Sequence, residues 1–82
     1  MTKKIIVYGT TWCPDCIKVR KFLDRNGIPF EWIDIGKVRE ARVIVEEINN
    51  GFRSVPTILW PDGSHLVEPS IQELKTKIQN YQ

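Results

Sequence analysis

The chain has 82 residues, of which 41% are hydrophobic and 27% are charged, and its formal net charge at pH 7 is +2. This length allows one domain, residues 1–82, built on a single modest core. The composition is that of a globular protein rather than a disordered one. Because lysines and arginines are spread along the chain without a dense basic run, we expect no nucleic-acid partner.

The N-terminal sequence and the overall hydropathy bear on the compartment. The first apolar run, residues 5–8, is far too short for the apolar region of a secretory signal, and no stretch is long enough to cross a membrane. We therefore expect a cytoplasmic protein with no membrane partner. In a reducing compartment, two cysteines three positions apart indicate a redox or metal site rather than a structural disulfide.

The first half of the chain predicts a strand, a helix and a second strand. Residues 5–8 form a continuous apolar run, typical of a strand buried on both faces. Pro14 stands where the first turn of a helix accepts proline, and Asn26 with Gly27 supplies the helix end. Between these limits the apolar residues recur at helical spacing, namely Ile17, Val19, Phe22 and Leu23. Residues 30–35 predict the second strand.

The second half predicts a helix, a hairpin and a last helix. Four apolar residues mark one face of the first of these helices, Ala41, Ile44, Val45 and Ile48. Residues 57–60 predict a third strand, and the Pro-Asp-Gly-Ser turn after it predicts a hairpin with a short strand around Leu66 and Val67. Ser70 and Glu73 form a capping box. It opens a helix that turns three residues inward, Ile71, Leu74 and Ile78.

The order of elements is therefore β-α-β-α-β-β-α. The first β-α-β unit predicts a right-handed crossover between two parallel strands, and the hairpin must add antiparallel strands to the same sheet. Helices on both faces complete three layers. We expect an α/β fold with a four-stranded mixed sheet and three helices.

Cys13 and Cys16 stand at the predicted junction of the first strand and the first helix. The unpaired N–H groups and the dipole at a helix N-terminus favour negative charge, and so favour the thiolate of Cys13. A thiolate is the species that attacks a disulfide. Cys16, one turn further along, is close enough to close a small ring and is expected to be more enclosed. The pair thus predicts a redox-active disulfide in which Cys13 attacks and Cys16 resolves.

Other interpretations of the two cysteines were weighed against this one. They could be ordinary buried thiols. A structural zinc site needs four ligands, whereas the chain offers the two cysteines and His65, so we expect no metal site within a monomer. An iron–sulfur cluster shared by two chains is the alternative from a different functional class.

The chain resembles the glutaredoxin family, within the thioredoxin-like superfamily, over nearly its whole length. The resemblance rests on the segment from Thr11 to Cys16, on Ser54-Val55-Pro56-Thr57, and on Asp62-Gly63-Ser64 followed by Pro69-Ser70. It implies a thioredoxin-like fold in which Pro56 is a cis proline beside the cysteine pair. It also implies that the backbone of Val55 pairs with an extended thiol peptide as an added strand.

The resemblance also bears on the low-molecular-weight thiol. Glutathione-using members carry a lysine at the position of Thr10 and a Gly-Gly pair where this chain has Glu68-Pro69, although the capping Ser70 is retained. The chain more closely resembles the mycoredoxin subgroup, which implies mycothiol, except that Pro14 stands where that subgroup often has glycine. We expect no bound cofactor, and a thiol co-substrate that is either glutathione or mycothiol.

Several other side chains have roles that the sequence predicts. Trp12 is expected to form one lip of the site, which gives a substrate-binding set of Trp12, Val55, Pro56 and Ser70. Arg53 is placed to draw an anionic group, or else is simply solvated. His65 is not expected to act in catalysis, because disulfide exchange needs only a thiolate and a leaving thiol. Two further pairs are expected on the wet faces of helices, Arg20 with Lys21, and Arg42 with Glu46 as an i,i+4 pair.

The function predicted from these residues is thiol–disulfide exchange by an enzyme. The partners are disulfide-containing proteins or mixed disulfides, with electrons supplied by a low-molecular-weight thiol or by a thioredoxin-type reductase. In the second case the protein is a thioredoxin-like electron donor to one specific protein. We expect a monomer.

Overall fold

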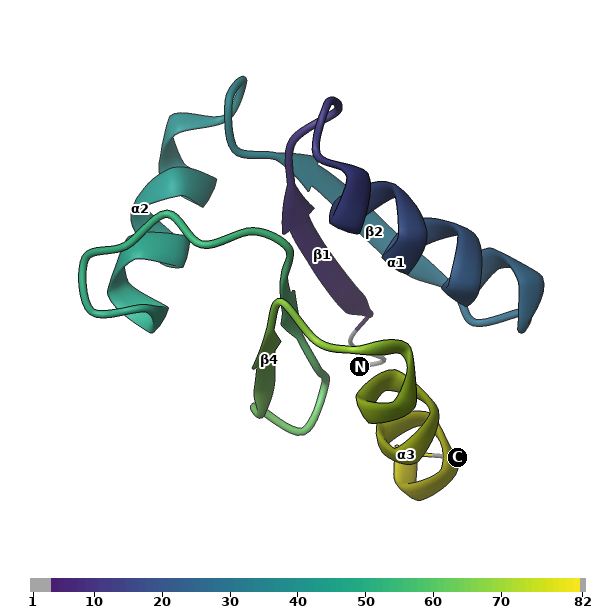
Figure 1. The fold of residues 1–82 in the computed structure, drawn as a ribbon. Helices are drawn as coiled ribbons and strands as arrows, with labels where there is room; N and C mark the ends of the chain where they lie inside the picture. Colours follow the sequence, from purple (N-terminus) through teal and green to yellow (C-terminus); the bar gives the residue numbers. More distant parts are fainter. Residues whose placement is uncertain (1–3, 82) are drawn as a thin grey trace.

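The computed structural model describes residues 4–81, which form one sheet and three helices in the expected order (Figure 1). The elements are β1 (Ile5–Gly9), α1 (Pro14–Arg25), β2 (Phe30–Asp34), α2 (Arg39–Ile48), β3 (Thr57–Leu59), β4 (His65–Val67) and α3 (Ile71–Tyr81). The expected strand ends are correct to within one residue, since β1 extends to Gly9 while β2 and β3 each end one residue early. No helix within the described range is long and apolar enough to span a membrane.

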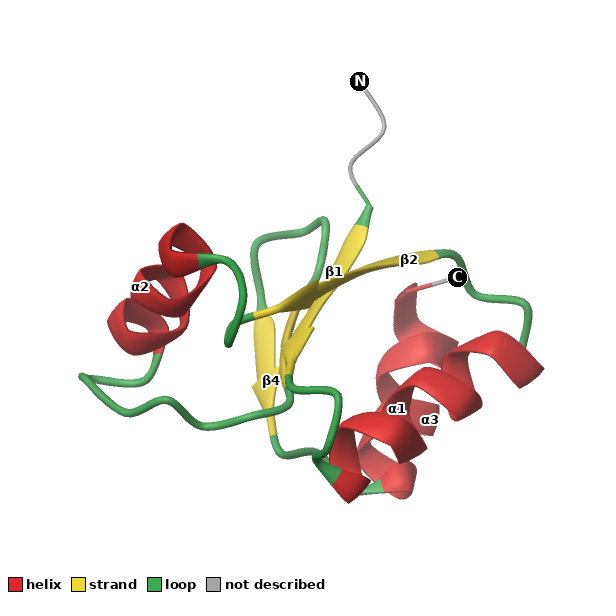
Figure 2. Ribbon diagram, turned by 90° about the horizontal axis from the view of Figure 1, so that it is seen from above, coloured by secondary structure: helices red, strands yellow, loops and turns green. Residues whose placement is uncertain are grey.

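The four strands form one mixed sheet in the order β2-β1-β3-β4. β1 pairs in parallel with β2 and antiparallel with β3, and β3 forms the antiparallel hairpin with β4. Helix α2 covers one face of the sheet, and α1 and α3 cover the other (Figure 2). The three-layer α/β architecture predicted from the sequence is therefore confirmed.

The core lies on both faces of β1, as its uninterrupted apolar sequence predicts. Successive side chains of a strand point to opposite faces, so Val7 packs toward α1 and α3 whereas Tyr8 packs toward α2. The cluster under α1 and α3 is the larger, with Ile5, Val7, Val19, Leu23, Ile28, Ile58, Trp60, Leu74 and Ile78. The cluster under α2 consists of Tyr8, Ile35, Ala41 and Val45.

Three residues expected to face the core lie at its margin instead. Ile17, Ile44 and Ile71 are each more than one third exposed. In α1 the inward positions four and seven residues before Leu23 are Val19 and Cys16, and Cys16 is fully buried. A helix buries only a stripe, and Cys16 occupies that stripe beside Ile17 as Val45 does beside Ile44, whereas Ile71 and both of its neighbours are exposed at the start of α3.

Polar contacts stabilise the last helix at two points, its own first turn and its contact with the hairpin. The expected capping box is present, with Glu73 N–H donating to Ser70 Oγ at 3.1 Å and Ser70 N–H donating to Glu73 Oε1 at 2.9 Å. Further along, Lys77 Nζ donates to Asp62 Oδ2 at 3.0 Å and to Ser64 Oγ at 2.7 Å in the β3–β4 turn. The first set of contacts caps α3, and the second fixes the helix to the hairpin.

Candidate active site

Cys13 occupies the cap position immediately before α1. Its backbone is extended, its N–H donates to the Thr10 carbonyl at 3.4 Å, and its own carbonyl accepts the N–H of Ile17 at 3.1 Å. The Sγ atom accepts the N–H of Cys16 at 3.3 Å. This is the role that serine or aspartate usually fills at a helix start, and both the donor and the helix dipole favour a negatively charged sulfur there.

Cys16 lies one turn further along α1 and has no exposed surface. Burial is the main cause that raises the pKa of the Cys16 thiol, to about 12, with smaller contributions from its hydrogen bond to Cys13 and from the charge of Asp15. Both cysteines are free thiols, and Cys13 is the more accessible of the two. The expectation that Cys16 is the more enclosed sulfur is therefore confirmed.

Gly9 explains how Cys16 fits so closely against the sheet. A Cβ at this position would lie 2.6 Å from Cys16 Sγ and 2.7 Å from a ring carbon of Trp32, both closer than atoms normally approach. Only a residue without a side chain allows the first turn of α1 to pack this closely against the end of β1. The Arg20 guanidinium lies over the ring of Trp32, 4.2 Å from the ring centroid. Arg20 was expected only on the solvated face of the helix, and this cation–π contact adds to that expectation.

A groove of about 420 Å³ opens beside Cys13. Trp12 and Pro14 line it on the side of α1, and Val55, Arg42 and Arg53 line it on the side of α2. Trp12 is 81% exposed, which agrees with its expected position at the lip. Thr10 lies at the buried end of the groove, and its Oγ1 has no hydrogen-bond partner within residues 4–81.

Val55 lines the groove that Cys13 borders, and Pro56 follows it as a buried residue. The peptide bond between them is cis, as the resemblance implies. No hydrogen bond from the Val55 backbone occurs within the described part of the chain, whereas the Pro56 carbonyl accepts the N–H of Glu68 at 2.8 Å. Pro56 is buried behind the groove, whereas Val55 borders the groove, so the backbone groups of Val55 are the ones next to it.

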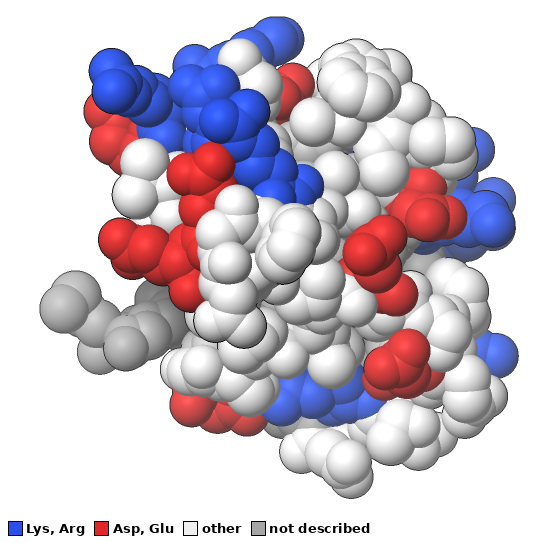
Figure 3. Space-filling model, turned by 60° about the vertical axis from the view of Figure 1, so that its left-hand side comes forward, with Lys and Arg blue, Asp and Glu red and all other residues white. Residues whose placement is uncertain are grey.

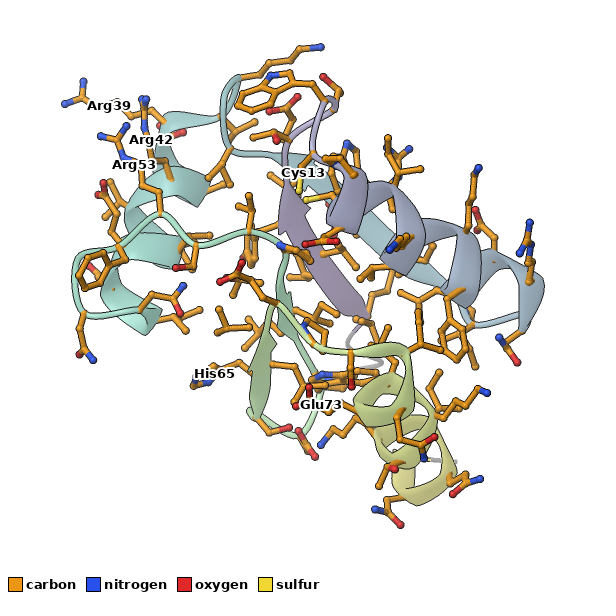
Figure 4. All side chains as sticks on the ribbon, in the orientation of Figure 1. Cys13, Arg39, Arg42, Arg53, His65 and Glu73 are labelled. Carbon is orange, nitrogen blue, oxygen red and sulfur yellow. The ribbon has the colours of Figure 1, made fainter. Side chains whose placement is uncertain are left out.

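Two arginines from distant parts of the sequence meet at this groove. Figure 4 shows Arg42 from α2 and Arg53 from the following loop on the same side of Cys13. Arg53 Nε lies 2.7 Å from Glu46 Oε2. The expected Arg42–Glu46 pair is therefore wrong, because Glu46 binds Arg53 instead and leaves Arg42 without an ion pair within residues 4–81.

Ser70, the fourth expected binding residue, is not in the groove. It lies in an adjoining hollow of about 310 Å³, which it shares with Asp15, Lys18, Glu68 and Glu73. The first turn of α1 separates the two spaces, since Pro14 lines the groove and Asp15 lines the hollow. The structure thus brings Cys13, Trp12 and Val55 together, and places Ser70 beyond Asp15.

The remaining candidates lie elsewhere. His65 is exposed on β4, away from Cys13 (Figure 4). No group of three or more His, Cys, Asp and Glu side chains gathers in metal-binding geometry within residues 4–81. A further hollow, of about 700 Å³, is lined in part by Phe30, Glu31, Leu59 and Pro61, none of which contributes to the cysteine groove.

Sequence reasoning missed Gly9 and Arg42 as site residues. Gly9 follows the apolar run of residues 5–8 and precedes Cys13 by four residues, and a glycine at the end of a buried strand is a signal of close approach by a neighbouring element. Arg42 carries no such signal, because its place beside the groove depends on how α2 docks on the sheet.

The comparisons with known proteins agree with this geometry. The glutaredoxin family model matches residues 5–66. Mycoredoxin 1 of Corynebacterium glutamicum is 37% identical over 75 residues, which cover 92% of each chain, and the glutaredoxin of Pseudomonas aeruginosa is 32% identical over 76% of this chain and 71% of its own. The crystal structure of glutaredoxin grx-1 from Archaeoglobus fulgidus matches with a TM-score of 0.76 and 31% identity, over 93% of this chain and 86% of that one. The chain belongs to the glutaredoxin family and is a thiol–disulfide oxidoreductase with a thioredoxin-like fold.

Proposed function

We propose that Cys13 is the attacking thiolate and Cys16 the resolving thiol of a two-cysteine exchange reaction. The observation that carries this proposal is the difference between the two sulfurs. Cys13 Sγ borders the groove and accepts a backbone N–H, whereas Cys16 is buried with the pKa of its thiol raised to about 12. A nucleophile must be ionised and accessible, while a resolving thiol must stay protonated until the mixed disulfide has formed.

The reaction proceeds in two balanced steps. The Cys13 thiolate attacks one sulfur of the partner disulfide, a bond forms between them, and the other partner sulfur leaves as a thiolate that takes a proton from solvent. Cys16 then loses its proton and attacks Cys13 Sγ, which displaces the second partner sulfur. The partner has gained two electrons and two protons, and the protein holds a Cys13–Cys16 disulfide.

The residues proposed to bind the partner are Trp12, Val55, Pro56 and Ser70. The unpaired N–H and carbonyl of Val55 are available to an extended chain that passes over Cys13, and the buried ring of Pro56 fixes the direction of that backbone. Trp12 offers a broad apolar surface at the lip. Ser70 acts through the start of α3, where its hydroxyl already serves the capping box.

Regeneration of the two thiols requires a reductant, and we propose a low-molecular-weight thiol, either glutathione or mycothiol. The position of Glu68 beside Ser70 and Asp15 places negative charge around the adjoining hollow, which opposes a second carboxylate there. That feature favours mycothiol over glutathione, as does the similarity to mycoredoxin 1.

The test compares reduction of a glutathione mixed disulfide with that of a mycothiol mixed disulfide by the wild type, Cys13→Ser and Cys16→Ser. We expect no turnover by Cys13→Ser, and accumulation of a covalent Cys13 adduct in Cys16→Ser, detected by mass spectrometry after an acid quench. Faster turnover with the mycothiol substrate identifies the co-substrate. If both substrates are ignored while a thioredoxin reductase recycles the protein, the thiol assignment is wrong and the protein is a thioredoxin-like donor.

A further inference from the structure

The charges that line the cysteine groove are of one sign. Of the described residues that border it, only Arg42 and Arg53 are charged. Glu46 holds the Arg53 guanidinium at the groove through the 2.7 Å contact, and Arg42 has no acidic partner within residues 4–81. We name these two arginines the basic bank. Arginine is well suited to such a place, because its planar guanidinium binds carboxylates through two parallel hydrogen bonds.

The hollow on the other side of the first turn of α1 has the opposite character. It is lined by three carboxylates, Asp15, Glu68 and Glu73, and by one ammonium group, that of Lys18. Glu73 is held by the capping box, whereas Asp15 and Glu68 are exposed and accept no hydrogen bond from other residues in the described part of the chain. We name Asp15 and Glu68 the acidic bank.

The two banks flank the position at which a target disulfide must lie. Lys and Arg side chains gather at the upper left of the face drawn in Figure 3, and a separate group of Asp and Glu side chains lies toward the right with neutral surface between them. An extended chain advances about 3.3 Å per residue, and residues two apart point to the same face. The residues two before and two after the target cysteine therefore lie about 7 Å along the backbone to either side of it, on the face that it presents to the protein. Cys13 borders the groove of the basic bank, and the first turn of α1 separates that groove from the hollow of the acidic bank.

We propose that this oxidoreductase selects disulfides in extended protein segments by the order of charges around the target cysteine. An acidic side chain faces Arg42 and Arg53, and a basic side chain on the other flank faces Asp15 and Glu68. The inference rests on the proposed function, since it concerns the substrate of the same Cys13 groove. Complementary charge fixes the register of the bound segment and raises the association rate more than it tightens the complex.

Two blocked peptides of identical composition test the proposal, the symmetric disulfides of Asp-Ala-Cys-Ala-Lys and of Lys-Ala-Cys-Ala-Asp. Their net charge is the same, so long-range attraction by the whole protein is equal for both. Single-turnover reduction by the pre-reduced protein is followed by acid quench and alkylation, and each rate is divided by the rate with dithiothreitol to remove intrinsic reactivity. We expect one order to react about five- to tenfold faster, which corresponds to two exposed charge pairs, and the ratio to shrink at high salt.

Charge-neutral variants assign the effect to the two banks. In Arg42→Gln/Arg53→Gln and in Glu68→Gln the ratio should fall toward one, because one flank of the segment loses its partner. The matched control for the double variant is Lys21→Gln/Lys75→Gln, which removes two exposed charges from α1 and α3 outside both spaces and should keep the wild-type ratio.

The outcomes separate this inference from the proposed function. Equal rates for the two peptides, or a preference that stays at the wild-type ratio in Arg42→Gln/Arg53→Gln or in Glu68→Gln, overturn the inference while Cys13-dependent reduction still supports the function. Failure of the wild type to reduce either peptide, or reduction that persists in Cys13→Ser, overturns both.

Discussion

The first turns of α1 and α3 are capped by the same kind of side-chain hydrogen bond, but the two caps differ in what else they contain. In each, the side chain at the cap accepts the backbone N–H three residues on, which is Cys16 to Cys13 Sγ at 3.3 Å and Glu73 to Ser70 Oγ at 3.1 Å. In α3 the bond is returned, because the Glu73 carboxylate accepts the Ser70 N–H. In α1 the third residue is Cys16, which is buried, and the Cys13 N–H turns back to the Thr10 carbonyl.

This difference shows how a structural motif becomes reactive. A helix cap already supplies what a thiolate needs, namely an N–H donor and the positive end of a dipole. Sulfur replaces oxygen at the cap of α1, and a buried thiol replaces the closing carboxylate, so a second sulfur lies one turn away from the cap atom, as the proposed reaction requires.

The largest expected effect is the loss of exchange activity in Cys13→Ser, which gives α1 the serine cap that α3 has. In Cys13→Ser the hydroxyl keeps the cap but is no nucleophile at neutral pH, so exchange should fall to the uncatalysed rate. Because serine is a favourable cap, the free energy of unfolding should change by less than about 1 kcal/mol. Single-turnover kinetics and urea unfolding measure the two quantities. Exchange activity that survives would show that Cys13 is not the nucleophile.

Gly9→Ala tests the close contact of Gly9 with Cys16 and Trp32, which places the first turn of α1 against the end of β1. The added methyl group would overlap Cys16 Sγ and Trp32, so the protein should lose about 1–3 kcal/mol of stability. The same change in a Cys16→Ala background removes one of the two overlaps and should cost less. Equal losses in the two backgrounds, measured by urea unfolding, would show that Cys16 is not the residue that requires glycine here.

The buried thiol also predicts a dependence of stability on pH. Its pKa is raised in the folded protein from an ordinary value near 9 to about 12, so the unfolded chain releases this proton first. The resulting stabilisation is complete below about pH 8.5 and is lost as the pH rises toward 12. Between pH 8.5 and 10.5 the wild type should therefore lose more stability than Cys16→Ala, under reducing conditions. Parallel pH profiles would contradict the shift.

The smallest effect is expected at α3. Ser70→Ala removes the cap oxygen and should lower the free energy of unfolding by about 1 kcal/mol. Thr76→Ala is the matched control, since it removes a hydroxyl group from an exposed position within the same helix. A loss no greater than that of Thr76→Ala would mean that the capping box contributes nothing measurable.

Local sequence signals predicted most of the fold and half of the site. The capping box at Ser70, the turn after Trp60 and the proline after Cys13 each act within a few residues, and each was found correctly. Ile17 and Ile44 were misplaced because helical spacing defines a stripe only to within one position, and the docking of the helix decides which neighbour is buried. The partner of Glu46 was misassigned for a similar reason. Arg53 reaches it from the loop after α2, and no local pattern competes with the i,i+4 rule.

The groove is made of two walls that come from separate parts of the chain. The wall with Trp12 and Cys13 belongs to the strand-to-helix turn, and the opposite wall comes from α2 and the loop that leads to Val55. On the proposals made here the two walls serve different purposes in evolution, since the first carries the two sulfurs while the basic bank of the second, together with the acidic bank beyond the first turn of α1, selects the partner. Substitutions at Arg42 and Arg53 would then change the preferred substrate while the cysteine pair, its helix and Gly9 stay unchanged.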